Sequence, residues 1–261
     1  MFDRSLWAER YTTVPSWPCP RCAIGQLQLV EGSLVNEETG WSSTAHSHEA
    51  WEPDWIEKRY SAHLRCSDAQ CGERAVVVGT VKCDLDYGYD YDGQTTMEVV
   101  EIFYPEFIHP SPSLIALVEE TPTDVFEEIQ RASSLIWIDT SSSANKLRLA
   151  AERVLTALKV NRTKIQKSKR RPLMLNERIG LLGPQYAEIA DLLHSIRFLG
   201  NHGSHESAVS VDRSDLLNAF EIMEHVISIA FSTKAKRVKA AAKDIKRRKG
   251  KPPVRNKKST L

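Results

Sequence analysis

The sequence lacks the long apolar runs and the leader segment of membrane and exported proteins. None of its 261 residues belongs to a run of roughly eighteen apolar residues, which crossing a bilayer requires. The first ten residues, MFDRSLWAER, have no basic head followed by an apolar core, which argues against a secretory signal. Cysteine is scarce, and its odd number, five, argues against a disulfide framework. We therefore expect a cytoplasmic, reducing setting and no membrane partner.

Charge is unevenly distributed, although the formal net charge is only +1. Residues 1–130 carry 8 basic and 23 acidic side chains, and residues 131–233 carry 14 basic and 10 acidic ones. Residues 234–261 carry 13 basic side chains and one acidic one. We predict a basic tail over residues 233–261, helix-prone at first and disordered after Pro253. It serves either as a nucleic-acid arm or as a solubilising end.

Four of the five cysteines lie in two short turns that are each followed by glycine. The turns read Cys-Pro-Arg-Cys and Cys-x4-Cys, and strand-like residues flank both. Thiolates hold zinc tetrahedrally, and turn glycines let backbone amides approach the sulfurs. The pattern predicts a zinc-ribbon-like β domain over residues 1–104. Its structural zinc would be bound by Cys19, Cys22, Cys66 and Cys71. The alternatives are two unrelated turns, or His63 in place of one cysteine.

The segment between the two cysteine turns, residues 31–59, is an insertion rich in tryptophan. Its His46 and His48 form an H-x-H pair, which can bind metal but on a polar loop is more often only exposed. We expect the aromatic side chains to fold the insertion onto the ribbon. Farther on, Cys83 is expected to be a bystander, residues 84–92 a solvated acidic loop, and residues 97–104 a strand.

A change of hydrophobic period from 2 to 3.6 at Thr121 marks a helical region. Prolines before it predict a linker over residues 105–120. Four amphipathic helices are expected within residues 121–232, the first capped by Thr121 and the last by Asp212 or Ser214. Short loops between them predict an antiparallel bundle. The predicted fold class is therefore α+β: an antiparallel β domain followed by a helical bundle.

A basic loop is predicted over residues 161–172, between the second helix and a short one. Its cations could contact nucleic-acid phosphates, or the loop could be only a solvated connector. The candidate nucleic-acid-binding residues are Arg162, Lys164, Lys167, Lys169, Arg170 and Arg171.

A cluster of polar residues ends the third long helix. At about 100° per residue, Arg197, Asn201 and His205 share one helix face, whereas His202 points away. A cation beside a group that titrates near neutral pH suits binding a phosphate and moving a proton on it. In the plainer alternative, Gly200 ends the helix as a C-cap and the polar residues satisfy backbone groups in a turn.

Three motifs in this order resemble the family known as domain of unknown function 4145, a bacterial helical module. They are Leu-Arg-x-Ala-x-Glu at 147–152, Leu-x-x-Arg-Ile at 175–179 and Arg-x-x-Gly-Asn-x-x-x-His at 197–205. The resemblance covers roughly residues 104–232, and members often carry a cysteine-pair ribbon in front. That family is similar to the HEPN superfamily, which includes many metal-independent endoribonucleases of toxin and antiviral systems. The resemblance implies a HEPN-like bundle that forms a homodimer.

The resemblance implies two alternative functions. The first is an accessory module of a bacterial defence or restriction system that binds RNA, DNA or a protein partner. The second is a metal-independent endoribonuclease in which Arg197 holds the charge on phosphate. His205 or His202 would then be its acid or base, and Asn201 would orient the phosphate or the imidazole. Arg197-x4-His202 fits the nuclease spacing and Arg197-x7-His205 fits the family form, so spacing does not choose between the histidines.

Overall fold

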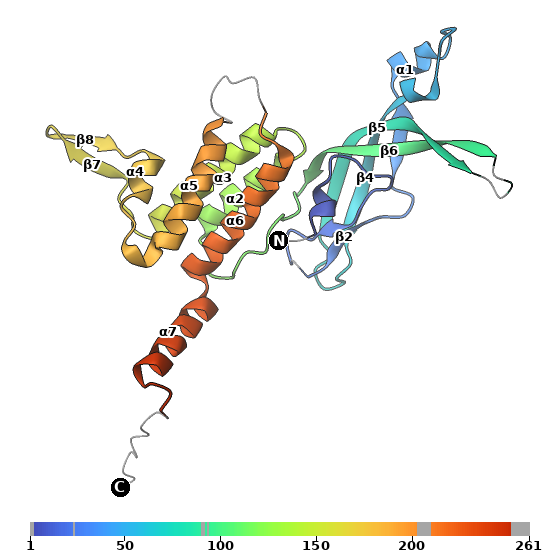
Figure 1. Ribbon diagram of the computed structural model, residues 1–261. Helices are drawn as coiled ribbons and strands as arrows, with labels where there is room; N and C mark the ends of the chain where they lie inside the picture. The colour runs from blue at the N-terminus through green and yellow to red at the C-terminus, as the bar shows by residue number, and fades with distance from the viewer. Residues whose placement is uncertain (1–2, 23, 90–91, 93, 203–209, 252–261) are drawn as a thin grey trace.

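The computed structural model describes residues 3–22, 24–89, 92, 94–202 and 210–251 (Figure 1). An antiparallel sheet forms the N-terminal part, and helices form the C-terminal part. An extended segment after residue 109 leads from one part to the other (Figure 1). The predicted mixture of a β region followed by a helical region is confirmed. Within the described ranges, no helix is long and apolar enough to cross a membrane.

The sheet has six strands in the spatial order β1-β2-β4-β5-β6, with β3 also paired to β4. Buried and exposed residues alternate along β4 from Tyr60 to Cys66 and along the first part of β5, so that Leu64, Val77 and Val81 face the core. One cysteine turn connects β1 to β2, and the other connects β4 to β5. The strands are β1 (Trp17–Pro18), β2 (Gln26–Leu29), β3 (Val35–Glu38), β4 (Glu57–Cys66), β5 (Arg74–Tyr89) and β6 (Thr95–His109).

The β5–β6 hairpin is longer than predicted. Residues 84–89, expected in a solvated loop, continue β5 and pair with β6 down to Tyr89 opposite Thr95. The loop prediction is wrong because acidic residues alternate with apolar ones here, as in Asp84-Leu85, which is the period-2 pattern of a strand. The acidic composition obscured that period.

Pro105 also lies inside β6, so the linker predicted to begin there begins only after His109. Proline cannot donate to a ladder, and strands tolerate it at a sheet edge or a bulge. Both conditions hold, because β6 is the last strand in the order and the register shifts between Val78 and Gly79. A Cβ on Gly79 would lie 2.1 Å from the Tyr104 carbonyl oxygen, so glycine permits this close approach.

The insertion at residues 31–59 joins the sheet through β3 and adds a short helix, α1 (Gly40–Ala45), and a turn of 3₁₀ helix, η2 (Pro53–Trp55). The His46 ring stacks on Trp51 with centroids 4.5 Å apart, and His46 Nε2 lies 2.7 Å from Glu38 Oε1. His48 lies against Trp55. These two histidines therefore help to fold the insertion.

The helical part contains α2 (Thr123–Ser134), α3 (Thr140–Ala157), α4 (Leu175–Ile179), α5 (Ala187–His202), α6 (Arg213–Phe231) and α7 (Thr233–Arg247). Helix α3 packs against α2, α5 and α6 around a core that includes Leu147, Leu193 and Phe220. Asp212 caps α6 as expected, because its carboxylate accepts the N–H groups of Ser214 and Asp215. The prediction that Thr121 caps α2 is wrong: the cap is Pro122, and the Thr121 hydroxyl donates to Val118.

One further segment differs from the prediction, and another agrees with it. The basic loop over residues 161–172 contains a hairpin, β7 (Thr163–Gln166) paired with β8 (Lys169–Pro172). Its turn residues Lys167 and Ser168 have φ values of 49° and 60°, the left-handed pair of a tight two-residue hairpin turn. The start of the basic tail forms α7, as its helix-prone sequence suggested.

A cluster of tryptophans joins the sheet to the helices. Trp7, on the 3₁₀ turn η1 (Arg4–Trp7), and Trp17 of β1 are both fully buried. Each packs against Trp137, with ring centroids 5.5 and 5.9 Å away, and Trp137 Nε1 donates to the Ala8 carbonyl. One continuous apolar core therefore runs from the β-sheet into the bundle.

Candidate functional site

The four predicted cysteines converge at the end of the sheet. Their sulfur atoms all lie within 4.8 Å of one another, although the two pairs are more than forty residues apart in sequence. Cys19 and Cys71 sulfurs are 3.8 Å apart, and Cys22 and Cys66 sulfurs are 3.7 Å apart. Four thiolates around a tetrahedral ion with bonds of about 2.3 Å have sulfurs about 3.8 Å apart. The cluster has the composition and spacing to bind a metal ion.

Glycine and the backbone hold the first turn around the sulfurs. The Gly25 N–H donates to Cys22 Sγ at 3.4 Å, and the Cys19 N–H donates to the Gly25 carbonyl at 3.0 Å. A Cβ on Gly25 would lie 2.5 Å from Cys66 Sγ, where it would displace the sulfur. In the second turn, Gly72 takes the left-handed conformation at φ 60° and donates its N–H to Asp68.

The same environment sets the acidity of the thiols. The N–H groups of Gly25 and Ile24 point at Cys22 and lower the pKa of its thiol to about 7. Burial instead raises the pKa of the Cys66 thiol to about 12. Cys83 is buried away from the cluster beside Lys58 and takes no part in it.

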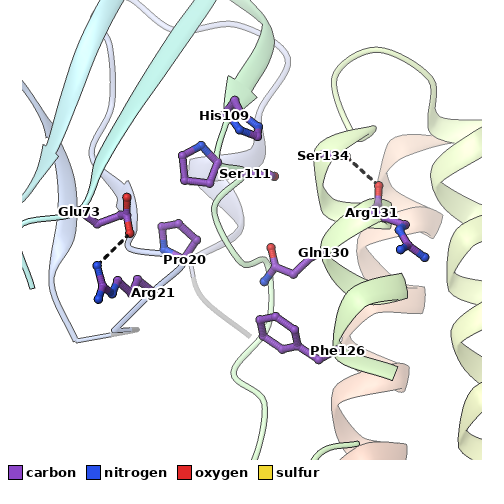
Figure 2. Close-up of a pocket in the computed structure, with 10 residues that line it drawn as sticks. Pro20, Arg21, Glu73, His109, Ser111, Phe126, Gln130, Arg131 and Ser134 are labelled. Atoms are coloured by element: carbon purple, nitrogen blue, oxygen red, sulfur yellow. Dashed lines mark hydrogen bonds and ion pairs between the residues drawn. The ribbon is translucent and has the colours of Figure 1, made fainter. Parts of the chain in front are cut away.

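A cleft of about 410 Å³ lies beside the cysteine cluster, between the sheet and α2. Figure 2 shows Pro20 and Arg21 of the first cysteine turn on one side and Phe126 and Gln130 of α2 on the other. Arg21 lies 3.7 Å from Glu73, which follows the second cysteine turn. Both turns therefore form one wall of the cleft. Sequence reasoning missed this cleft, because its other wall comes from a helix some fifty residues after the second cysteine turn.

The β7–β8 hairpin carries the six predicted basic residues. Lys164 and Arg171 are engaged by Glu177 of α4, at 2.8 and 2.6 Å. The other four cations, Arg162, Lys167, Lys169 and Arg170, are exposed. Within the described residues, no carboxylate forms a salt bridge with any of these four. The hairpin thus presents unpaired positive charge to solvent.

The structure describes only part of the proposed Arg-Asn-His motif. Helix α5 continues through Gly200 to His202, so the prediction that Gly200 ends the helix is wrong. Arg197 is half-buried, and its guanidinium lies over the Phe198 ring at 4.2 Å. The Asn201 and His202 side chains and the whole of His205 lie outside the described part, so the structure does not test their convergence on one face.

Gly200 is instead a packing residue where α5 crosses α3. A Cβ on Gly200 would lie 2.8 Å from Arg148 Cβ and 3.2 Å from the Ala144 carbonyl oxygen. Its missing side chain therefore lets the two helices approach closely. This contact joins the first sequence motif, which contains Arg148, to the third.

Arg178, in the second motif, is also a structural residue. It is almost fully buried, and its guanidinium donates to the Glu152 carbonyl at 3.0 Å and to the Thr156 hydroxyl at 2.9 Å. These bonds tie α4 to the C-terminal turns of α3. This role could not be predicted from the sequence, because the partners of Arg178 lie on another helix.

Two family models match the chain, one over most of the sheet part and one over most of the helical part. Residues 9–108 match the family model described as a domain of unknown function (DUF8608). Residues 130–248 match the model described as a domain of unknown function (DUF4145), which supports the resemblance of the helical part and extends it into α7. No curated protein and no solved structure matches the chain.

Proposed function

We propose that this protein is a nucleic-acid-binding accessory module and that the β7–β8 hairpin is its contact surface. The observation that carries the proposal is the four exposed cations on the hairpin, at residues 162, 167, 169 and 170, without a carboxylate partner in the described chain. Unpaired lysine and arginine side chains bind phosphates without first giving up an internal ion pair. Two-stranded ribbons of this kind also fit nucleic-acid grooves.

The turn of the hairpin supports the same proposal. Positive φ values at both turn positions favour asparagine and glycine, yet Lys167 and Ser168 occupy them. A side chain in the left-handed region costs about 1–2 kcal/mol. A lysine at this strained position of the tip is therefore consistent with a role for its charge.

The cysteine cluster is proposed to hold a structural zinc ion. Four thiolates give zinc a closed coordination sphere, with no open position for a substrate. The zinc would fix the two cysteine turns relative to each other, and with them Arg21 and Glu73 at the cleft. The role of the module in a defence or restriction system, which the resemblance implies, stays a prediction.

Titration of fluorescent single-stranded RNA, and of single-stranded and duplex DNA of the same sequence, tests the proposal at several salt concentrations. The variant K167A/K169A/R170A removes three cations from the hairpin, and R10A/R65A/R74A removes three exposed cations from the sheet region. We expect the first variant alone to weaken binding. The slope of the logarithm of its association constant against the logarithm of salt concentration should become shallower by about 2 for single strands, at about 0.7 per lost phosphate contact. Equal weakening by both variants would show only a net-charge effect and would refute the assignment to the hairpin.

A further inference from the structure

The outer part of the β5–β6 hairpin extends beyond the rest of the sheet. Strand β4 pairs with β5 as far as Glu57 opposite Lys82, and the next N–H, that of Cys83, still donates to the Ile56 carbonyl. From Asp84 onward, the described residues of β5 pair only with β6. We call residues 84–89 and 95–100 the arm. Figure 1 shows it projecting from the sheet. A two-stranded ribbon buries little of its surface and is marginally stable by itself in water.

The arm has one apolar face, which no other part of the chain that the structure describes covers. Leu85 lies opposite Val99, and Tyr87 lies opposite Met97, so these four side chains share a face. Tyr87, Met97 and Val99 are 64%, 58% and 50% exposed. The opposite face is acidic, with Asp84, Asp86 and Glu98. None of these three carboxylates forms an ion pair with any residue that the structure describes.

Helix α7 carries another apolar surface, a stripe that no residue described by the structure covers. It leaves the bundle after α6 and extends away from it (Figure 1). Val238 and Ile245, seven residues apart and therefore on the same face, are 57% and 55% exposed, and Ala241 and Ala242 lie between them. Basic side chains flank the stripe on both sides, among them Arg237 and Lys246. Such a helix is typically covered by a partner whose surface is apolar and acidic.

We propose that α7 of one molecule docks on the apolar face of the arm of a second molecule. The two surfaces are complementary in charge, and each exposes apolar side chains that the other would cover. The stripe from Val238 to Ile245 is about 10 Å long, and adjacent cross-strand pairs of the arm are about 7 Å apart. The arm is a single layer of two strands, so basic side chains beside the stripe would lie within about one Debye length, about 10 Å at 0.1 M salt, of the carboxylates on its other face.

Charge and position select this pairing over the alternatives. Two arms packed together would bring carboxylates close to carboxylates, and two α7 helices would bring cations close to cations, which costs free energy. In Figure 1 the arm and α7 point away from opposite parts of the molecule, so α7 reaches an arm only in a second copy. Contact of two different surfaces in this way is head-to-tail and continues from copy to copy.

Two variants of the full chain test the proposal by sedimentation velocity over a range of concentrations. The arm variant is Y87S/M97S/V99S, and the α7 variant is V238S/I245S. All five residues are exposed, so circular dichroism should show both variants folded. The control, I138S/L181S, alters two residues that are 56% and 55% exposed outside both surfaces.

We expect the wild type and the control to associate at low salt, less so at high salt, and each test variant alone to stay monomeric. An equimolar mixture of the two test variants should form a one-to-one dimer and nothing longer, because one supplies α7 and the other supplies the arm. A monomeric wild type would overturn the proposal. So would association of either test variant by itself, or failure of the mixture to associate. The nucleic-acid hairpin is unchanged throughout, so failure here leaves the proposed function intact.

Discussion

Glu177 of α4 accepts two hydrogen bonds from the guanidinium of Arg171 in the β7–β8 hairpin. Arg171 Nη1 donates to Oε2 at 2.9 Å, and Nη2 donates to Oε1 at 2.6 Å. The same carboxylate accepts Lys164 Nζ at 2.8 Å and the Met174 N–H at 3.0 Å. The Glu177 side chain thus caps the N-terminus of α4 and connects the proposed nucleic-acid surface to the bundle. Hydrogen bonds from these donors, of which Arg171 has the largest effect, hold the pKa of Glu177 well below its usual range.

The substitution Glu177→Gln should therefore release the hairpin without unfolding the bundle. A neutral amide loses the charge-assisted bonds to Arg171 and Lys164 but keeps the size of the side chain. Amide hydrogen exchange at residues 163–172 should become faster at pH 7, while exchange in the core of α3 and α6 stays slow. Unchanged exchange in the hairpin would show that its own strand pairing suffices to order it.

The pH dependence of this contact has a definite sign. A carboxylate whose pKa is lower in the folded state stabilises that state above its unfolded pKa of about 4.3, and this contribution is lost as the pH falls. The ratio of hairpin exchange rates in Glu177→Gln and in the wild type should thus be largest at neutral pH and approach one in the acid range. Taking the ratio at each pH cancels the intrinsic pH dependence of exchange and the titration of other carboxylates.

Sequence reasoning succeeded where the signal is local. The Cys-Pro-Arg-Cys turn and its glycine predicted a cluster that the structure brings together, and Asp212 caps α6 as its position suggested. It failed where partners are distant. Arg178 belongs to a predicted motif and Glu177 occupies one of its variable positions, but their contacts with Thr156 and Arg171 depend on how the hairpin and helices pack. The arm was missed because its acidic residues looked like a loop.

Gly25→Ala should impair metal binding at the cysteine cluster. Its Cβ would lie 2.5 Å from Cys66 Sγ and 2.9 Å from the Asp68 nitrogen, so the sulfur or the turn must shift. Elemental analysis of purified wild-type protein should give one zinc per chain, and the variant should retain clearly less. Gly40→Ala is the matched control, because no atom lies within 4 Å of its added Cβ and the site lies outside the cluster. Equal zinc content in wild type and Gly25→Ala would contradict the geometry described for this turn.

Gly200→Ala should destabilise the bundle by forcing α5 away from α3. The added Cβ would meet Arg148 Cβ at 2.8 Å, and overpacking of this kind typically costs about 1–3 kcal/mol. Urea denaturation followed by circular dichroism measures the change. Gly180→Ala provides the comparison, since its nearest neighbours would be 3.6 Å away and its stability should change little. Similar midpoints for Gly200→Ala and the wild type would mean that the helices separate at no cost.

The polar motif at the end of α5 is expected to serve binding and packing rather than RNA cleavage. Arg197 lies over Phe198, and the glycine of the motif is used to pack α5 on Arg148. Labelled single-stranded RNA incubated with the wild type without added metal should therefore bind and remain intact. Cleavage by the wild type, with loss of activity in folded Arg197→Ala and His205→Ala, would instead support the metal-independent endoribonuclease. The variants Asn201→Ala and His202→Ala would then show which histidine acts, because the true acid–base residue changes the pH profile of cleavage and a positioning residue does not.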